Sequence, residues 1–171
     1  MNKRPRWITR TERPTDVTAI RDVNTAAFET SDEADLVDTL RQDPAWIDGL
    51  SMVTTSEAGT VVGHALLTRC YIGDIAALCL APCAVLPEYQ RTGAGSAVIR
   101  AVIQAARDCG EDFIVVLGHP EYYPRFGFER ASIHGIELTI DVPDDALLAL
   151  SLNKEKRLPA GVVRYAAPFG I

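Results

Sequence analysis

Apolar and polar positions alternate along this chain with two different periods. Apolar residues recur at helical spacing in three stretches, and the first of them, Val17 to Ala27, follows Thr15, a residue suited to cap a helix. The other two predicted helices run from Ser31 to about Asp43 and from Ser96 to about Asp108. Short runs rich in apolar and β-branched residues separate the helices. These runs predict strands at residues 7–10, 50–55, 60–68, 78–86, 113–117, 136–140 and 162–165.

Residues 144–152 are the stretch that this pattern leaves open, because Leu147, Leu148 and Leu150 fit a helix or a strand equally well. Elsewhere, strands and helices follow one another without repeats, low-complexity tracts or linkers. At 171 residues the chain has the length of about one domain. We therefore expect a single α/β domain that extends over residues 1–171 and contains a mixed sheet.

Composition and charge narrow the class of protein. Hydrophobic residues make up 47% of the chain, yet no apolar run reaches the roughly 18 residues of a membrane span. The start of the chain is basic but no hydrophobic segment follows it, so we expect a cytoplasmic protein without a membrane partner. The net charge of −6 disfavours sequence-independent binding of nucleic acid, which depends on neutralising phosphates. A mildly acidic surface instead suits a cationic partner such as an amine.

The four cysteines do not form a metal motif. They stand at positions 70, 79, 83 and 109, without paired C-x-x-C spacing and without a matching pair of histidines. We expect no metal site and interpret the cysteines as reduced core thiols.

The segment between the strand predicted at 78–86 and the helix predicted to begin at Ser96 has the features of an anion site. Pro87 ends the strand, and the sequence Gln90-Arg91-Thr92-Gly93-Ala94-Gly95 leads into the helix. The first amides of a helix have no partner within the helix, and the helix dipole is positive at that end. Such a turn binds anions, most often a pyrophosphate.

Two common nucleotide-binding motifs do not fit this turn. A P-loop requires a lysine after its last glycine, and none is present. A dinucleotide-binding turn requires G-x-G-x-x-G directly after the strand, whereas here Val98 stands at the sixth position and residues 87–92 separate strand and glycine. The remaining pattern is Gln90-x-x-Gly93-x-Gly95.

This pattern, placed after the strand end Val85-x-Pro87, is similar to the acetyl-CoA motif of the GNAT superfamily of N-acetyltransferases. A second segment, Tyr123-x-x-x-Gly127-Phe128, looks like the Y-x-x-x-G-F segment of the same superfamily. The resemblance is closer still to the YhbS-like branch of predicted acetyltransferases, and it spans nearly the whole chain. The matching segments are Ala84 to Gly95, Val116 to Phe128 and Gly161 to Tyr165.

The resemblance implies a single-domain α/β (α+β) fold, with a mixed, mostly antiparallel sheet that is splayed between its central strands and with helices on both faces. It implies acetyl-CoA as acyl donor, lying in the gap between the strand that ends at Val85 and the strand that ends at Leu117. Gly93 and Gly95 are expected to keep Cβ atoms away from the pyrophosphate and to adopt unusual φ angles. The implied cofactor-binding residues are Ala84, Val85, Leu86, Gln90, Arg91, Thr92, Gly93, Ala94, Gly95, Ser96 and Tyr123.

Catalytic roles follow from the same resemblance. The amide of Val85 is expected to stabilise the oxyanion, and Tyr123 to protonate the departing thiolate, with Tyr122 as the alternative. Many relatives carry a glutamate on the strand before the CoA loop, but residues 78–86 contain no acidic side chain. The candidate general bases are therefore Glu33 and His119, with a water chain as the alternative. A mechanism through an acylated Cys83 is disfavoured because no histidine accompanies it in the sequence.

The predicted function is acetyl transfer from acetyl-CoA to a primary amine, by direct attack in a ternary complex. The acceptor is a small-molecule amine or an amine of a peptide or protein, and its identity stays open, as does the length of the acyl chain. The alternative is a non-catalytic module that senses CoA or acyl-CoA and acts through a protein partner; retention of Tyr123 favours the enzyme. The predicted strand after Gly161 is a candidate for pairing in a homodimer.

Overall fold

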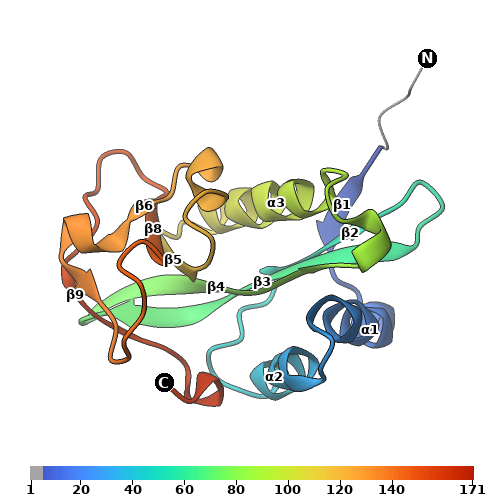
Figure 1. Cartoon of the computed structure of the whole chain (residues 1–171), viewed down its shortest axis with the longest axis horizontal. Coiled ribbons are helices and arrows are strands. Elements are labelled where there is room, and N and C mark those ends of the chain that lie inside the picture. The colour runs from blue at the N-terminus through green and yellow to red at the C-terminus, as the bar shows by residue number, and fades with distance from the viewer. Residues whose placement is uncertain (1–5) are drawn as a thin grey trace.

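The computed structural model describes residues 6–171, in which helices cover both faces of a twisted sheet (Figure 1). Helices α1 (Val17–Phe28) and α2 (Asp32–Arg41) lie on one face, and α3 (Ala94–Asp108) lies on the other. The basic start of the chain falls largely outside the described residues. The three helices occupy the predicted stretches, and the arrangement confirms helices on both faces.

Within residues 6–171, nine strands form the sheet, and most of them pair antiparallel. The main path has the order β1-β2-β3-β4-β5-β8-β6, and β7 and β9 lie off this path. Parallel pairing occurs between β4 and β5 and between β7 and β9. The strands are β1 (Ile8–Thr11), β2 (Ser51–Thr55), β3 (Val61–Ile72), β4 (Ile75–Val85), β5 (Phe113–Leu117), β6 (Glu129–Arg130), β7 (Ile136–Glu137), β8 (Leu147–Ser151) and β9 (Gly161–Arg164).

The boundaries of two central strands differ from the prediction. β3 continues beyond residue 68, to Ile72, and β4 begins before residue 78, at Ile75. The two strands meet in a tight hairpin at Gly73, which has φ +59°. The predicted boundaries were wrong because Arg69 and Tyr71 interrupt the apolar run, although the backbone pairing continues through both. The strand predicted at 136–140 is shortened to the two residues of β7. Residues 144–152, for which helix and strand were equally favoured, contain β8 at Leu147–Ser151. The leucines of β8 are buried where the strand pairs with β5 and β6.

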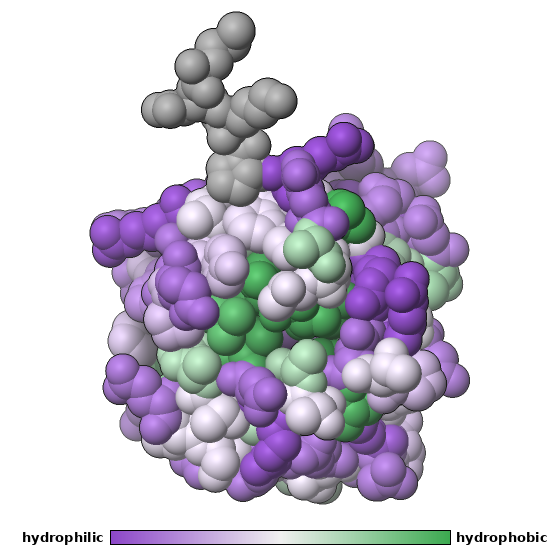
Figure 2. Space-filling model, turned by 90° about the vertical axis from the view of Figure 1, so that its right-hand side faces the viewer, coloured by the Kyte–Doolittle hydropathy of each residue, from purple (hydrophilic) through white to green (hydrophobic). Residues whose placement is uncertain are grey.

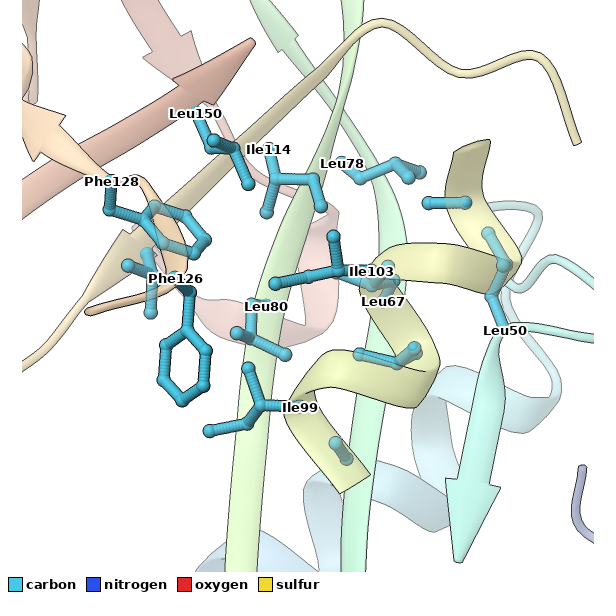
Figure 3. Packing of buried hydrophobic residues seen from close by; sticks show 14 of the residues in the cluster. Leu50, Leu67, Leu78, Leu80, Ile99, Ile103, Ile114, Phe126, Phe128 and Leu150 are labelled. Carbon is cyan, nitrogen blue, oxygen red and sulfur yellow. The ribbon is translucent and has the colours of Figure 1, made fainter. Parts of the chain in front are cut away.

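The core between α3 and the sheet fixes the position of the turn at residues 90–95. Val98, Ile99, Val102 and Ile103 are buried on one side of α3. Figure 3 shows Ile99 and Ile103 among Leu67, Leu80 and Ile114 of the sheet, with Phe126 and Phe128 closing the same cluster. Each buried aliphatic side chain of this kind contributes about 1.5–3 kcal/mol of transfer free energy. This packing holds the N-terminal end of α3 beside the end of β4.

Candidate active site

The central strands separate at one end. β4 and β5 pair over only Leu78 with Ile114 and Cys79 with Val115, after which β4 continues to Val85 and β5 to Leu117. The two strands therefore diverge beyond this short parallel ladder. The GNAT resemblance predicted this divergence between the strand that ends at Val85 and the strand that ends at Leu117.

The backbone of Val85 faces the gap between the diverging strands. The Leu86 amide donates to the Val62 carbonyl of β3 at 2.9 Å. Because successive residues of a strand direct their amides to opposite edges, the neighbouring amide of Val85 points away from β3. The Val85 carbonyl points the same way and accepts a hydrogen bond from the Gln90 side chain at 3.2 Å. Gln90, predicted to contact the cofactor, thus caps the end of β4.

The turn that follows β4 offers a run of free amides. The first backbone bond of α3 runs from the Ala97 amide to the Gly93 carbonyl at 3.0 Å. Among residues 6–171, no backbone amide from Arg91 to Ser96 forms a hydrogen bond of good geometry outside α3, and only weaker turn contacts occur at residues 90–93. Because such amides lie at the positive end of the α3 dipole, they are suited to bind an anion, and we call residues 91–96 the predicted anion-binding turn.

Positive φ angles shape this turn. Gly93 has φ +91° and Arg91 has φ +62°, the latter unusual for a residue with a side chain. A Cβ at Gly93 would meet no protein atom within 4 Å, so its backbone conformation is what requires glycine. Gly95 differs from the prediction: its φ is ordinary, and a Cβ there would lie 3.2 Å from Val85 Cγ2. Gly95 therefore lets α3 approach the end of β4.

Distant residues hold the turn by its carbonyls. The Trp7 indole Nε1 donates to the Thr92 carbonyl at 3.0 Å, and Thr54 Oγ1 donates to the Ala94 carbonyl at 3.0 Å. Thr92 Oγ1 donates to the Tyr89 carbonyl, and the Tyr89 ring meets Trp7 edge-on at 5.7 Å. These contacts fix the turn and leave its amides free. The sequence analysis missed Trp7 and Thr54, since no local pattern relates them to the turn.

Tyr123 reaches the gap from the β5 side. It begins a 3₁₀ turn (Tyr123–Phe126), and its ring covers Gly118, where an added Cβ would lie 2.2 Å from Tyr123 Cε2. Burial, and secondarily Cys83 and Tyr122, raise the pKa of the Tyr123 phenol. Cys83 of β4 and Tyr123 pack against the same apolar cluster. The Tyr123 hydroxyl has no hydrogen-bond partner within the part of the chain that the structure describes.

Tyr122 points elsewhere. Its hydroxyl is 3.1 Å from Ser96 Oγ in the first turn of α3, and the Arg125 guanidinium lies 4.3 Å from its ring centre. The rings of Tyr122 and Tyr123 meet edge-on, with centres 5.2 Å apart. Of the two hydroxyls, that of Tyr123 is therefore the one left without a protein partner.

The other candidate catalytic residues lie in different places. His119 follows β5 directly, and its carbonyl accepts the amides of Tyr122 and Tyr123 at 3.1 and 3.4 Å. Glu33 is half-buried in the first turn of α2, where Thr30 Oγ1 donates to it at 3.4 Å. In the described residues, no hydrogen bond or ion pair joins Glu33 to the turn or to Tyr123. The backbone of His119 thus contacts the tyrosine segment, while its side chain is exposed.

Cys83 is a poor nucleophile in this position. Burial raises the pKa of its thiol to about 12. A thiol with such a pKa is protonated at neutral pH, and only the thiolate attacks a thioester efficiently. This agrees with the sequence argument against an acyl-cysteine mechanism.

A buried polar cluster lies under the end of β4, and the sequence analysis missed it. His64 of β3 pairs in register with Ala84 and has no exposed surface. Its ring nitrogens lie 3.2 Å from Asn24 Nδ2 and 2.9 Å from Ser51 Oγ. Burial, and to a lesser extent the Arg41 charge, lower the pKa of His64 to about 3. His64 is thus neutral and structural.

The surface at this end of the molecule has an apolar centre. Figure 2 views the face at which β4 ends and α3 begins, and an apolar area ringed by hydrophilic residues occupies it. Residues 6–171 hold no group of three or more side chains suited to a metal ion. Nor does this part of the chain contain a helix that is long and apolar enough to cross a membrane.

Comparison with known proteins decides the family. Residues 17–128, which include the anion-binding turn and Tyr123, match the model of the acetyltransferase (GNAT) family. The chain belongs to the GNAT family. It is 38% identical to the uncharacterised N-acetyltransferase YjhQ of Escherichia coli K12, over 90% of this chain and 88% of YjhQ. It is 32% identical to the uncharacterised N-acetyltransferase YhbS of the same strain, over 74% and 76% of the two chains.

Solved GNAT structures share the fold. The crystal structure of E. coli YhbS in complex with CoA superimposes with a TM-score of 0.90 at 26% identity, covering 100% of this chain and 96% of YhbS. A GNAT acetyltransferase of Brucella melitensis in complex with acetyl-CoA gives a TM-score of 0.79 at 31% identity, covering 96% and 98%. The predicted fold class, including the mostly antiparallel sheet, is confirmed.

Proposed function

We propose that this chain is an acetyl-CoA-dependent N-acetyltransferase that acetylates a primary amine by direct attack in a ternary complex. The observation that carries the proposal is the run of free amides from Arg91 to Ser96 beside the divergence of β4 and β5. Similar folds from E. coli and Brucella were solved with CoA and acetyl-CoA.

In this proposal the amides of residues 91–96 bind the pyrophosphate, and the pantetheine arm runs along the free edge of β4. Val85 keeps its amide free for the thioester carbonyl at the end of that arm, while the Leu86 amide is already bonded to β3. Ala84 and Leu86 then contribute packing rather than hydrogen bonds. The Gln90 side chain has to leave the Val85 carbonyl if the arm is to donate to that group in its place.

The reaction breaks the C–S bond of the thioester and forms an amide. The neutral amine attacks the carbonyl carbon, the Val85 amide donates to the oxyanion, and collapse expels the thiolate. Tyr123 donates a proton to sulfur and recovers one from the acylated nitrogen, so that one amine proton is transferred overall. Burial keeps Tyr123 protonated at neutral pH because it raises the pKa of the phenol.

The acceptor must lose a proton before it attacks. At pH 7 this costs about 4.6 kcal/mol for a lysine-type amine of pKa 10.4 and about 1.4 kcal/mol for an α-amine near pKa 8. His119 is our first candidate for the base because it adjoins the gap. Glu33 remains a candidate only if the acceptor spans the distance to α2, and a water chain is the alternative to both.

Replacing Tyr123 by phenylalanine tests its proposed role as the acid that protonates the thiolate. In a Trp46→Phe background, Trp7 is the only tryptophan left and contacts the turn, so its fluorescence reports acetyl-CoA binding. We expect Tyr123→Phe to lower kcat about 100-fold or more while the Kd of acetyl-CoA stays within about twofold. Tyr122→Phe is the matched control. An unchanged kcat for Tyr123→Phe removes Tyr123 from the mechanism, and absence of acetyl-CoA binding refutes the whole proposal.

The second candidate is a non-catalytic sensor of CoA or acyl-CoA that acts through a protein partner. It is favoured by the lack of an acidic residue on β4 and by the separate position of Glu33. Thiol release over a panel of small amines, amino acids and peptides separates the two functions. Saturable acetyl-CoA binding without turnover on any amine supports the sensor.

We place the protein in the cytoplasm, in keeping with four cysteines that form no disulfide. A homodimer through the edge near β9 is part of the same proposal. Light scattering of the intact protein tests it.

A further inference from the structure

A second cavity lies at the far end of β5 from the proposed acetyl-CoA site. It has a volume of about 700 Å³ and is enclosed by the ends of β6 and β8 and by the loop after β8. One of its lining residues, Ser151, pairs with Phe113 at the start of β5, whereas the gap lies beyond the other end, Leu117. Volumes of about 300–1,000 Å³ are typical of sites for small molecules.

The floor of this cavity is apolar. Leu150 of β8 lies in the lining beside Gly127, and Leu158 adds a half-buried side chain. Ile133 also belongs to the lining, and 72% of its surface is exposed. An apolar body of a ligand would remove this surface from water at a gain of about 25 cal/mol per Å².

The rim is positive, although the protein is acidic. The chain has three lysines, at positions 3, 154 and 156, and the last two line this cavity together with Arg157. Lys156 Nζ is bonded to Asp112 at 2.8 Å. Lys154 and Arg157 are exposed and form no ion pair within residues 6–171. Two cations therefore remain available to a ligand.

The acidic residue in the lining is already engaged. Glu129 Oε2 lies 2.6 Å from His134 Nε2, so this carboxylate has a hydrogen-bond partner on the side of the cavity. The charge that remains uncompensated at the rim is positive. An anionic group is thus the complement of the rim, and an apolar body is the complement of the floor.

We propose that this cavity binds a small organic anion, a carboxylate or phosphate attached to an apolar body. The anionic group binds Lys154 and Arg157, and the body packs on Leu150 and Leu158. The site is separate from the acetyl-CoA gap and does not depend on the function proposed for that gap.

The test uses 1-anilinonaphthalene-8-sulfonate, an aromatic anion that becomes fluorescent in apolar sites, added to the intact protein with and without saturating CoA. We expect saturable binding that CoA does not abolish. Lys154→Gln and Arg157→Gln should each weaken it at least about fivefold, since each removes one charge-assisted contact. The matched control is Arg107→Gln, which removes the same charge from the exposed side of α3 and should leave binding within about twofold.

Competition defines the ligand chemistry. Octanoate or octyl phosphate should displace the probe, and octanamide, which has the same body as octanoate without its charge, should not. The stronger of the two competitors identifies the anionic group. The proposal is overturned if the probe does not bind, if CoA abolishes its binding, or if the two rim variants behave like Arg107→Gln. It is also overturned if light scattering shows a dimer that Arg157→Gln dissociates, since the rim would then face a second copy of the chain.

Discussion

Replacing Gly118 by alanine should displace the Tyr123 ring while leaving every residue that we assign to chemistry unsubstituted. A Cβ at this position would lie 2.2 Å from Cε2 and 2.9 Å from Cδ2 of the Tyr123 ring. Ordinary contact between such carbon atoms requires about 3.5 Å, so the ring has to move by about 1 Å or more. Phe126 and Phe128 pack against the ring, with centres at 6.3 and 5.7 Å, and limit the directions in which it can move.

The magnitude follows from this displacement. A misplacement of about 1 Å in a catalytic group can reduce the rate about 100-fold, which corresponds to about 2.7 kcal/mol in the barrier. Overpacking should also lower the free energy of unfolding by about 1–3 kcal/mol. Affinity for acetyl-CoA should change little, because the turn at residues 91–96 is held by Trp7 and Thr54 instead.

The assay is a double-mutant cycle of kcat with Gly118→Ala and Tyr123→Phe, measured by thiol release on an accepted amine. If Gly118→Ala acts through the Tyr123 hydroxyl, it should cost little further activity in the Tyr123→Phe background. Gly63→Ala is the matched control, since its Cβ would meet Thr54 Cβ at an ordinary 3.4 Å. An unchanged kcat in Gly118→Ala, or fully additive losses, refutes the reasoning.

Three further predictions concern stability and the turn. Burial lowers the pKa of His64 to about 3, whereas an unfolded histidine titrates near 6.5. The unfolded state therefore binds the extra proton between these values, and this group alone should remove about 2 kcal/mol of stability between pH 7 and pH 5. Urea unfolding at both pH values should show this loss in the wild type and a smaller one in His64→Gln; equal losses contradict the assignment. Gly93→Ala, at φ +91°, should cost about 1 kcal/mol of stability and weaken CoA about tenfold, whereas Gly110→Ala, at φ +77°, should affect stability only. Arg69→Met, which breaks a two-fold contact with Glu111 at 2.7 and 2.9 Å, should cost about 1–3 kcal/mol in urea unfolding. Arg21→Met, whose partners are exposed, should cost much less, and equal losses would show that burial of the Arg69 pair does not matter.

The sequence by itself determined the parts of this protein that depend on neighbours in the chain. The helical stripe of α3, the positive φ at Gly93 and the free amides before Ala97 all arise within a few residues of one another. These local features were therefore predictable, as was the fold that the resemblance implied.

Only the tertiary structure decided what depends on distant contacts. Residues 144–152 became a strand because β5 and β6 pair with them, and no local signal favoured strand over helix. Trp7 and Thr54 hold the turn from 85 and 40 residues away. Tyr122 and Tyr123 are adjacent and chemically identical in the sequence, yet Ser96 engages one hydroxyl and leaves the other free. Periodicity and motif spacing describe only the chain near each residue, and packing between distant segments chose among the options that they left.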